Sequence, residues 1–155
     1  MTYYDRYKNE LKRLESTDEL FSKKEVAELT GLTPRTIHYY TDEGLVIPYV
    51  NPTGKGTTRK YSRLNIFELL LARELAEHNI LIRDIKQIML QLRGGKKVIG
   101  KGKELLFICD HKGSQGATML TAADENGYAK VNMAKYSSVI VFDISALRIR
   151  AGEIG

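Results

Sequence analysis

Residues 22–40 read SKKEVAELTGLTPRTIHYY, and this stretch decides the fold of the N-terminal half of the chain. Ser22, followed three residues later by Glu25, is a capping box, so a helix is expected to begin at this serine. Gly31 is expected to end that helix, because glycine adopts the left-handed conformation at little cost. The first part of the stretch therefore predicts a short helix that stops abruptly.

A second helix is expected to begin only two residues after this stop. Thr33 is a suitable N-cap, and Pro34 suits the first helical position, where its missing N–H is harmless. Ala27 is small where the two helices would cross, and Ile37 fills the angle between them. This spacing is typical of a helix-turn-helix, whose second helix enters the major groove of DNA with its N-terminal half. A plain helical hairpin in a protein core is the alternative that the spacing alone leaves open.

The segment after the second helix is rich in proline and glycine, which predicts a loop or hairpin. Residues 46–47 and 59–61 are expected to pair there as short strands. From Val46 to Leu64 the chain carries no acidic residue at all. Its cations in this window are Lys55, Arg59, Lys60 and Arg63. Such a one-sided loop is suited to bind the phosphate backbone of a nucleic acid.

Further helices are predicted on either side. Residues 3–16 carry apolar side chains at steps of three and four (Tyr4, Tyr7, Leu11 and Leu14), which predicts an amphipathic helix whose stripe must pack on something. Ser62 can cap a long helix that runs to about His78, with Asn79 as its left-handed terminator. The apolar positions expected on that helix are Leu64, Phe67, Leu71 and Leu75. A last helix over 82–92 closes at a pair of glycines.

The character of the sequence changes near residue 95. Residues 95–103 are basic and punctuated by glycine, which predicts a linker. Beyond it, strands are expected at 105–109, 117–121, 128–133 and 138–142, with a tight turn at Asn126-Gly127. We therefore expect an α+β chain made of an N-terminal amphipathic helix (1–19), a DNA-binding domain (20–94), the linker and a small β-rich C-terminal module (104–155) for oligomerisation or effector response.

Several separated motifs resemble the MerR family of bacterial regulators. They lie in the family's order and spacing over residues 20–92. They are FSKKEVA (21–27), TGLTPRTIHYY (30–40), EGLVIP (43–48), RKYS (59–62) and NILIRDIK (79–86). The resemblance implies a winged helix-turn-helix transcription regulator, with a recognition helix at about 34–42 in the major groove and a wing at about 46–61 on the backbone or minor groove of double-stranded DNA.

The resemblance also implies which residues face DNA. On the recognition helix they are Arg35, Thr36, His38 and Tyr39, and in the wing Arg59 and Lys60. The N-cap residue Thr33 and the loop cation Lys55 are expected to bind DNA together with them. Polar residues on an exposed helix face reach base edges, while basic loop residues supply attraction that is independent of sequence. Tyr40 and Tyr61 are expected to pack inside. RNA polymerase is a further partner that a regulator of this kind implies.

The chain departs from the family pattern at two places. His38 stands where the family usually has arginine, so that phosphate anchor is weaker near neutral pH, where histidine is mostly uncharged. Gly94-Gly95 and the linker stand where relatives usually have a long dimerisation helix, which puts the usual dimer and its promoter-untwisting mechanism in doubt. We expect a homodimer held mainly by residues 104–150, with the N-terminal helix as a second interface, and an unknown effector.

Composition and residue content bound the other functions. The chain has 24 Lys and Arg against 19 Asp and Glu, which is compatible with a nucleic-acid partner. With a single cysteine, Cys109, and no apolar run long enough for a membrane, a cytoplasmic location is expected. Neither a catalytic arrangement nor a metal or cofactor site is recognisable; Cys109-Asp110-His111 fits a strand end better than a metal site. The alternatives are a phage or recombination accessory factor, of the excisionase or packaging kind, and an enzyme with its chemistry in the C-terminal module.

Overall fold

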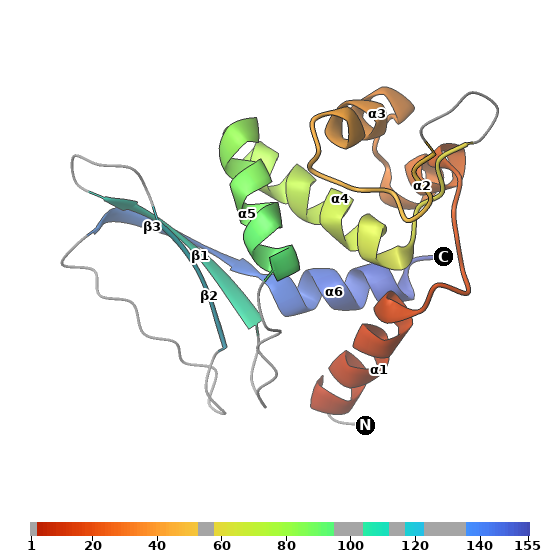
Figure 1. Ribbon diagram of the computed structural model, residues 1–155. Helices are drawn as coiled ribbons and strands as arrows, with labels where there is room; N and C mark the ends of the chain where they lie inside the picture. Colours follow the sequence, from red (N-terminus) through yellow and green to blue (C-terminus); the bar gives the residue numbers. More distant parts are fainter. Residues whose placement is uncertain (1–2, 53–57, 95–103, 112–116, 123–135) are drawn as a thin grey trace.

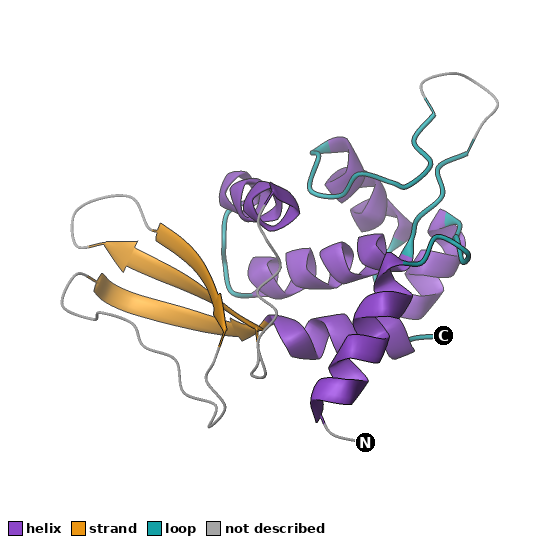
Figure 2. Ribbon diagram, turned by 60° about the horizontal axis from the view of Figure 1, so that its bottom comes forward, coloured by secondary structure: helices purple, strands orange, loops and turns teal. Residues whose placement is uncertain are grey.

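The computed structural model describes residues 3–52, 58–94, 104–111, 117–122 and 136–155. The helices form the body of the molecule, and the strands form a small sheet at one side of it (Figures 1 and 2). The described elements thus make an α+β fold. In chain order they are α1 (Tyr3–Glu15), α2 (Lys23–Thr30), α3 (Pro34–Asp42), α4 (Arg63–Glu77), α5 (Ile82–Gly94), β1 (Glu104–His111), β2 (Ala117–Ala122), β3 (Tyr136–Asp143) and α6 (Ile144–Glu153).

The helix signals read from residues 22–40 are confirmed. Ser22 Oγ accepts a hydrogen bond from the Glu25 amide at 3.2 Å, and Glu25 Oε1 accepts one from the Ser22 amide at 3.3 Å. Gly31 ends α2 in the left-handed region, with φ of 76°. Thr33 Oγ1 accepts from the Thr36 amide at 3.1 Å and caps α3. These local contacts fix where α2 and α3 begin and how sharply the chain turns between them.

Helix α4 lies at the centre of the molecule, with α2 and α3 on one side and α6 on the other (Figure 1). Ile66, Leu69 and Leu70 are fully buried, as are Leu71 and Leu75. The expected single apolar face was therefore too narrow, and Leu64, which was assigned to it, is 40% exposed. A helix that is apolar nearly all round is buried on more than one side, and this one provides the core for both neighbours.

The sheet has the strand order β2-β1-β3, with both pairs antiparallel. On its central strand Leu106 pairs with Leu120 of β2 and with Phe142 of β3. The strands expected at 105–109, 117–121 and 138–142 are confirmed, each slightly longer than expected. The strand expected at 128–133 and the turn at Asn126-Gly127 lie outside the described residues.

Helix α6 was not expected, because residues 144–153 were assigned to a β-rich module. Asp143 Oδ1 accepts from the Ala146 amide at 2.9 Å and caps its start. The helix packs against α1 and α4. Its exposed positions, Ala146, Arg150 and Glu153, recur at helical spacing, but its buried side includes Ser145 and Arg148. The apolar helical period is therefore weak in the sequence.

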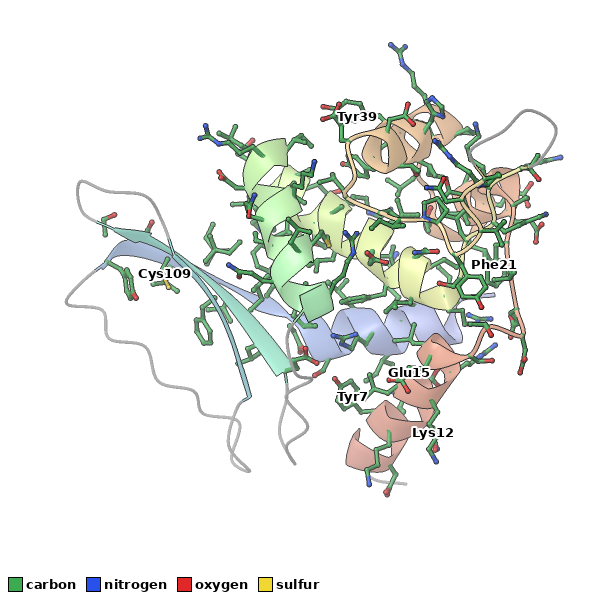
Figure 3. The ribbon with its side chains drawn as sticks, in the orientation of Figure 1. Tyr7, Lys12, Glu15, Phe21, Tyr39 and Cys109 are labelled. Carbon is green, nitrogen blue, oxygen red and sulfur yellow. The ribbon has the colours of Figure 1, made fainter. Side chains whose placement is uncertain are left out.

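Helix α1 agrees with the predicted bounds, and its apolar stripe packs within the chain. Tyr7 and Leu14 are each 2% exposed, and α1 packs against α6 and α4. Tyr7 lies on the side of α1 that meets α6 (Figure 3). The stripe is thus covered by the molecule's own helices. Tyr7 and Leu14 are therefore not exposed to a second copy, and an interface between copies through α1 stays a prediction. The side chain of Tyr4 lies outside the described residues.

A buried ion pair joins the tail to the helices. Arg148 Nε of α6 lies 3.1 Å from Glu104 Oε2 of β1, and Tyr7 of α1 donates to the same oxygen at 2.6 Å. The Arg148 guanidinium also lies 4.4 Å from the centre of the Phe67 ring of α4. One buried cluster contains residues of 20–94 together with residues of the tail. The division of the chain into these two domains stays a prediction.

Candidate nucleic-acid interface

Helix α3 has one buried side and one outward side. Ile37 is 0% exposed and Tyr40 is 7% exposed, so both pack inward as expected. Arg35 and His38 are exposed, and Tyr39 is 46% exposed and lies on the outer side of the helix (Figure 3). Buried and outward positions follow the helical repeat. The structure therefore brings the expected recognition residues together on one outward side of α3.

The start of α3 presents a pair of hydroxyl groups. Thr33 Oγ1 and Thr36 Oγ1 lie 2.9 Å apart, and either can be the donor. Thr33 Oγ1 is also the N-cap acceptor, so it already binds the Thr36 amide. Thr33 is exposed and Thr36 is half-buried. Both residues are at the end of the helix that the sequence predicts to meet DNA, and among the described residues the Thr36 hydroxyl contacts only Thr33.

The inner side of α3 is fixed by a buried tyrosine from the segment before α4. Thr41 Oγ1 donates to the Ile37 carbonyl at 2.8 Å and lies 3.0 Å from the hydroxyl of Tyr61. Tyr61 is fully buried, as expected. Its backbone pairs with Phe21 just before α2, with both N–O distances at 2.8 Å. The start of α2 and the end of α3 are thus tied to the same residue.

Two stretches of chain run antiparallel beside the helix-turn-helix. Val50 and Lys60 exchange backbone hydrogen bonds at 3.0 Å in both directions. Residues 53–57, which join these stretches, lie outside the described residues, and the expected Lys55 is among them. Lys60 is half-buried, and the side chain of Arg59 is 34% exposed. The expected pairing of residues 46–47 with residues 59–61 is wrong, because Lys60 pairs with Val50 and Tyr61 pairs with Phe21. The base of a hairpin is present at Val50 and Lys60, whereas the wing as a whole stays a prediction.

One carboxylate joins this hairpin to α3. Asp42 Oδ2 lies 2.9 Å from His38 Nε2, and Asp42 Oδ1 accepts from Arg59 Nη2 at 3.2 Å. Two of the expected DNA-facing residues, from different segments, thus share one partner. Sequence analysis did not identify Asp42. The step of four from His38 to Asp42 was a signal for half of the arrangement, since side chains at that spacing meet on a helix.

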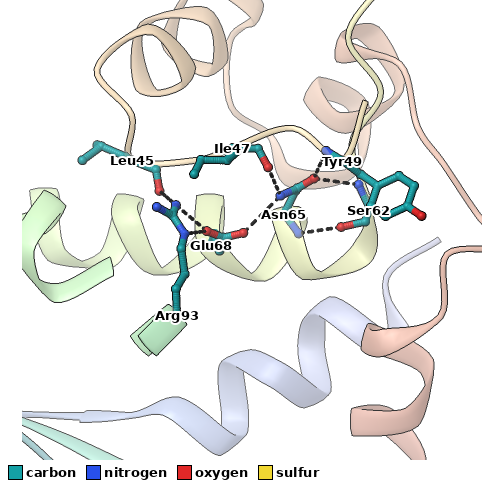
Figure 4. A network of polar contacts seen from close by, with 7 residues as sticks. All are labelled: Leu45, Ile47, Tyr49, Ser62, Asn65, Glu68 and Arg93. Atoms are coloured by element: carbon teal, nitrogen blue, oxygen red, sulfur yellow. Dashed lines mark hydrogen bonds and ion pairs between the residues drawn. The ribbon is translucent and has the colours of Figure 1, made fainter. Parts of the chain in front are cut away.

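A polar network on α4 fixes the segment that leads from α3 to the hairpin (Figure 4). Asn65 Nδ2 donates to the Ile47 carbonyl at 2.8 Å, and Asn65 Oδ1 accepts from the Tyr49 amide at 3.0 Å. Asn65 Nδ2 also donates to Glu68 Oε1 at 3.0 Å. The network thereby sets the path of the backbone immediately after α3.

The same network extends to the end of α5. Arg93 Nε and Nη2 donate to Glu68 Oε2 at 2.9 and 2.6 Å, and Arg93 Nη2 also donates to the Leu45 carbonyl. Burial raises the pKa of Glu68 above its ordinary value, and the neighbouring Arg93 opposes that rise. Sequence analysis missed Asn65, Glu68 and Arg93, because their network joins α4, α5 and the backbone of residues 45–49, which only the folded chain brings together.

Arg63 is a correction to the expected row of loop cations. Its side chain is 2% exposed and points away from the hairpin toward the C-terminal end of α6. Arg63 Nη1 donates to the carbonyls of Ala151, Gly152 and Ile154 at 3.1, 3.2 and 2.7 Å. Nη2 donates to Glu19 Oε2 at 2.7 Å. This arginine is a structural residue and is not available to phosphate.

The described residues contain no group of three or more His, Cys, Asp or Glu side chains that could hold a metal ion. Within the same residues no helix has the length and apolar character needed to cross a membrane. Cys109 is buried on β1, and the side chains of Asp110 and His111 lie outside what the structure describes. His78 is exposed at the end of α4, and its ring meets the edge of Phe142 with 5.1 Å between centres.

Comparison with known proteins agrees with this geometry. Residues 21–92 match a family model described as the MerR HTH family regulatory protein. The matched region runs from the residue before the α2 cap to α5, so it contains α2, α3, the hairpin base and α4. No curated protein matches the chain. The suspected resemblance to the MerR family is thus confirmed over these residues, while α1, the sheet and α6 lie outside the match.

Proposed function

From the match of residues 21–92 to the MerR helix-turn-helix regulators, we propose that this chain binds a specific site on double-stranded DNA and regulates transcription. The observation that carries the proposal is the outward side of α3. Arg35, His38 and Tyr39 are exposed there beside the basic residues of the hairpin base. A short polar helix side next to clustered cations suits the groove of a duplex better than a protein core.

In this proposal helix α3 and the hairpin have different roles. The first turns of α3 enter the major groove, where Arg35 and Thr36 reach base edges and Arg is best suited to guanine. Arg59 and Lys60 of the hairpin bind backbone phosphates, and Lys55 acts with them as part of a wing. Phosphate contacts set the register of the protein on the duplex, and the α3 contacts select the sequence.

Substitution in α3 tests this division. Arg35→Ala should weaken binding to the preferred site by about 1–3 kcal/mol and change binding to random duplex much less. Arg150→Ala is the matched control, because Arg150 is an exposed arginine on α6, on the other side of α4 from α3 (Figure 1). Fluorescence anisotropy with both duplexes measures each affinity. An equal loss on both duplexes would mean that Arg35 only holds the backbone, and the recognition helix would be misplaced.

A second copy on the same site is also part of the proposal, since one small domain reads few base pairs. The stripe on α1 is covered within the chain, which leaves the tail as the candidate interface. Val141 of β3 is 51% exposed there, and strands at the edge of a sheet readily pair with another chain. Sedimentation of the full chain tests this: a monomer at tens of micromolar would contradict a dimer held by the tail in the absence of DNA.

A further inference from the structure

Asp42 occupies an unusual place for an acidic residue. From Thr33 to Tyr61 the chain carries only two acids, Asp42 and Glu43. Asp42 lies between His38 of α3 and Arg59 of the hairpin, at 2.9 and 3.2 Å. A carboxylate in a surface that binds a polyanion costs affinity for any phosphate that approaches it. Its presence at this junction therefore calls for a function.

Stability does not supply that function. The side chains of His38, Asp42 and Arg59 are 56%, 47% and 34% exposed, and ion pairs so exposed contribute little to folding. What the contacts do is fix geometry. Arg59 is a long side chain with many rotamers, and Asp42 holds one of its terminal nitrogens against α3. Its remaining guanidinium nitrogens have no hydrogen-bond partner among the described residues, so they stay open to a phosphate or a base.

We propose that Asp42 is a specificity-determining residue of the DNA interface, acting by positioning Arg59 and His38. This inference rests on the proposed function above. In the free protein Asp42 compensates part of the charge of Arg59, which lowers the attraction of that guanidinium for phosphate in any sequence. On the preferred site the held guanidinium meets its partner without further loss of rotamer freedom. Asp42 thus weakens random binding more than specific binding, which is how a repulsive element creates selectivity.

The test is Asp42→Asn in the full-length chain, which keeps the shape of the side chain and removes its charge. Binding to random duplex should tighten about threefold, from the Coulomb energy of one charge about 7 Å from a phosphate in water. Binding to the preferred site should not share this gain, because a neutral amide oxygen holds Arg59 less firmly than the carboxylate does. The rotamer freedom that Arg59 regains in the free protein should offset the gain by roughly threefold at the preferred site. The ratio of the two affinities should fall by about threefold or more. The denaturant midpoint should stay close to that of the wild type.

Glu43→Gln is the matched control, since it removes the same charge one residue away. Glu43 is exposed, and no ion pair to it occurs among the described residues. Arg59→Ala in both backgrounds closes a double-mutant cycle, in which the Asp42 effect on the ratio should shrink markedly. An unchanged ratio in Asp42→Asn, or an equal fall in Glu43→Gln, would overturn the inference. A wild-type chain with no preferred site at all would instead overturn the proposed function.

Discussion

Replacing Arg63 with methionine removes a buried guanidinium while keeping much of the apolar stem. In the folded chain this group binds three carbonyls at the C-terminal end of α6 and the carboxylate of Glu19. It also lies 5.4 Å from the centre of the Phe21 ring. Each hydrogen bond to a charged group contributes roughly 1.5–3 kcal/mol, but such contributions do not add. Loss of one partner from a buried ionic cluster typically costs about 3–5 kcal/mol.

The outer acceptors, Glu19 and the Ile154 carbonyl, regain water when the arginine is lost, because neither is fully buried. We therefore expect the lower end of that range, about 3 kcal/mol, which is a large part of the roughly 5–15 kcal/mol that holds a domain folded. The assay is urea-induced unfolding followed by circular dichroism. Arg13→Met is the matched control, since Arg13 lies 3.7 Å from the same Glu19 with its side chain 42% exposed. It should cost less than about 1 kcal/mol.

The same experiment tests whether the tail and the helix-turn-helix share one folding unit. Arg63 is the first residue of α4, and its carbonyl partners lie at the C-terminal end of α6. The Arg63→Met chain should therefore unfold in a single transition whose urea midpoint is lower than that of the wild type. Two separate transitions, with only the second shifted, would show that the tail folds by itself. An Arg63→Met chain as stable as Arg13→Met would refute the reasoning that these hydrogen bonds secure α6.

Two further predictions concern buried polar groups. Burial and the nearby Glu104 raise the pKa of Tyr7, so the folded chain keeps the phenolic proton at a pH where an unfolded tyrosine has lost it. The free energy of unfolding should therefore fall as the pH rises above about 10. Urea titrations across that range should show a smaller fall for Tyr7→Phe. At neutral pH the same change should cost roughly 1–3 kcal/mol, because Glu104 loses a buried donor. Arg93→Met should cost about 3 kcal/mol, since it leaves Glu68 buried without its cation, and Glu68→Gln in the same chain should restore part of the loss. No recovery in that double variant would mean that Arg93 acts mainly through the Leu45 carbonyl.

Much of the helix-turn-helix could be predicted because its signals are local. A cap at Ser22, a glycine at position 31 and a proline after Thr33 each act on their own backbone, and Asn79 takes its expected positive φ of 60° for the same reason. The outward side of α3 followed from the helical repeat once its start was fixed. The DNA contacts of that side stay predictions, as do those of the hairpin cations.

What could not be predicted depends on groups far apart in the chain. In the sequence Arg63 is one more cation of the loop. The carbonyls that bind its guanidinium belong to α6, which only the folded chain brings next to it. Helix α6 itself has no clear apolar stripe in the sequence, because the side that it buries against α1 and α4 includes Ser145 and Arg148. Asp42 was overlooked because one of its two partners is Arg59, which lies 17 positions further along the chain. Such pairings are set by tertiary packing and leave no period in the sequence.

Selection of bound duplexes from a random pool by the full-length chain tests the central claim most directly. The account predicts one enriched sequence, bound at least about 10³-fold more tightly than its shuffled version at physiological salt. If two copies bind together, the enriched sequence should contain two half-sites about one helical turn apart, or a multiple of that distance. A pool that stays random after repeated rounds, or an enriched duplex bound no better than its shuffled form, would contradict site-specific recognition by α3.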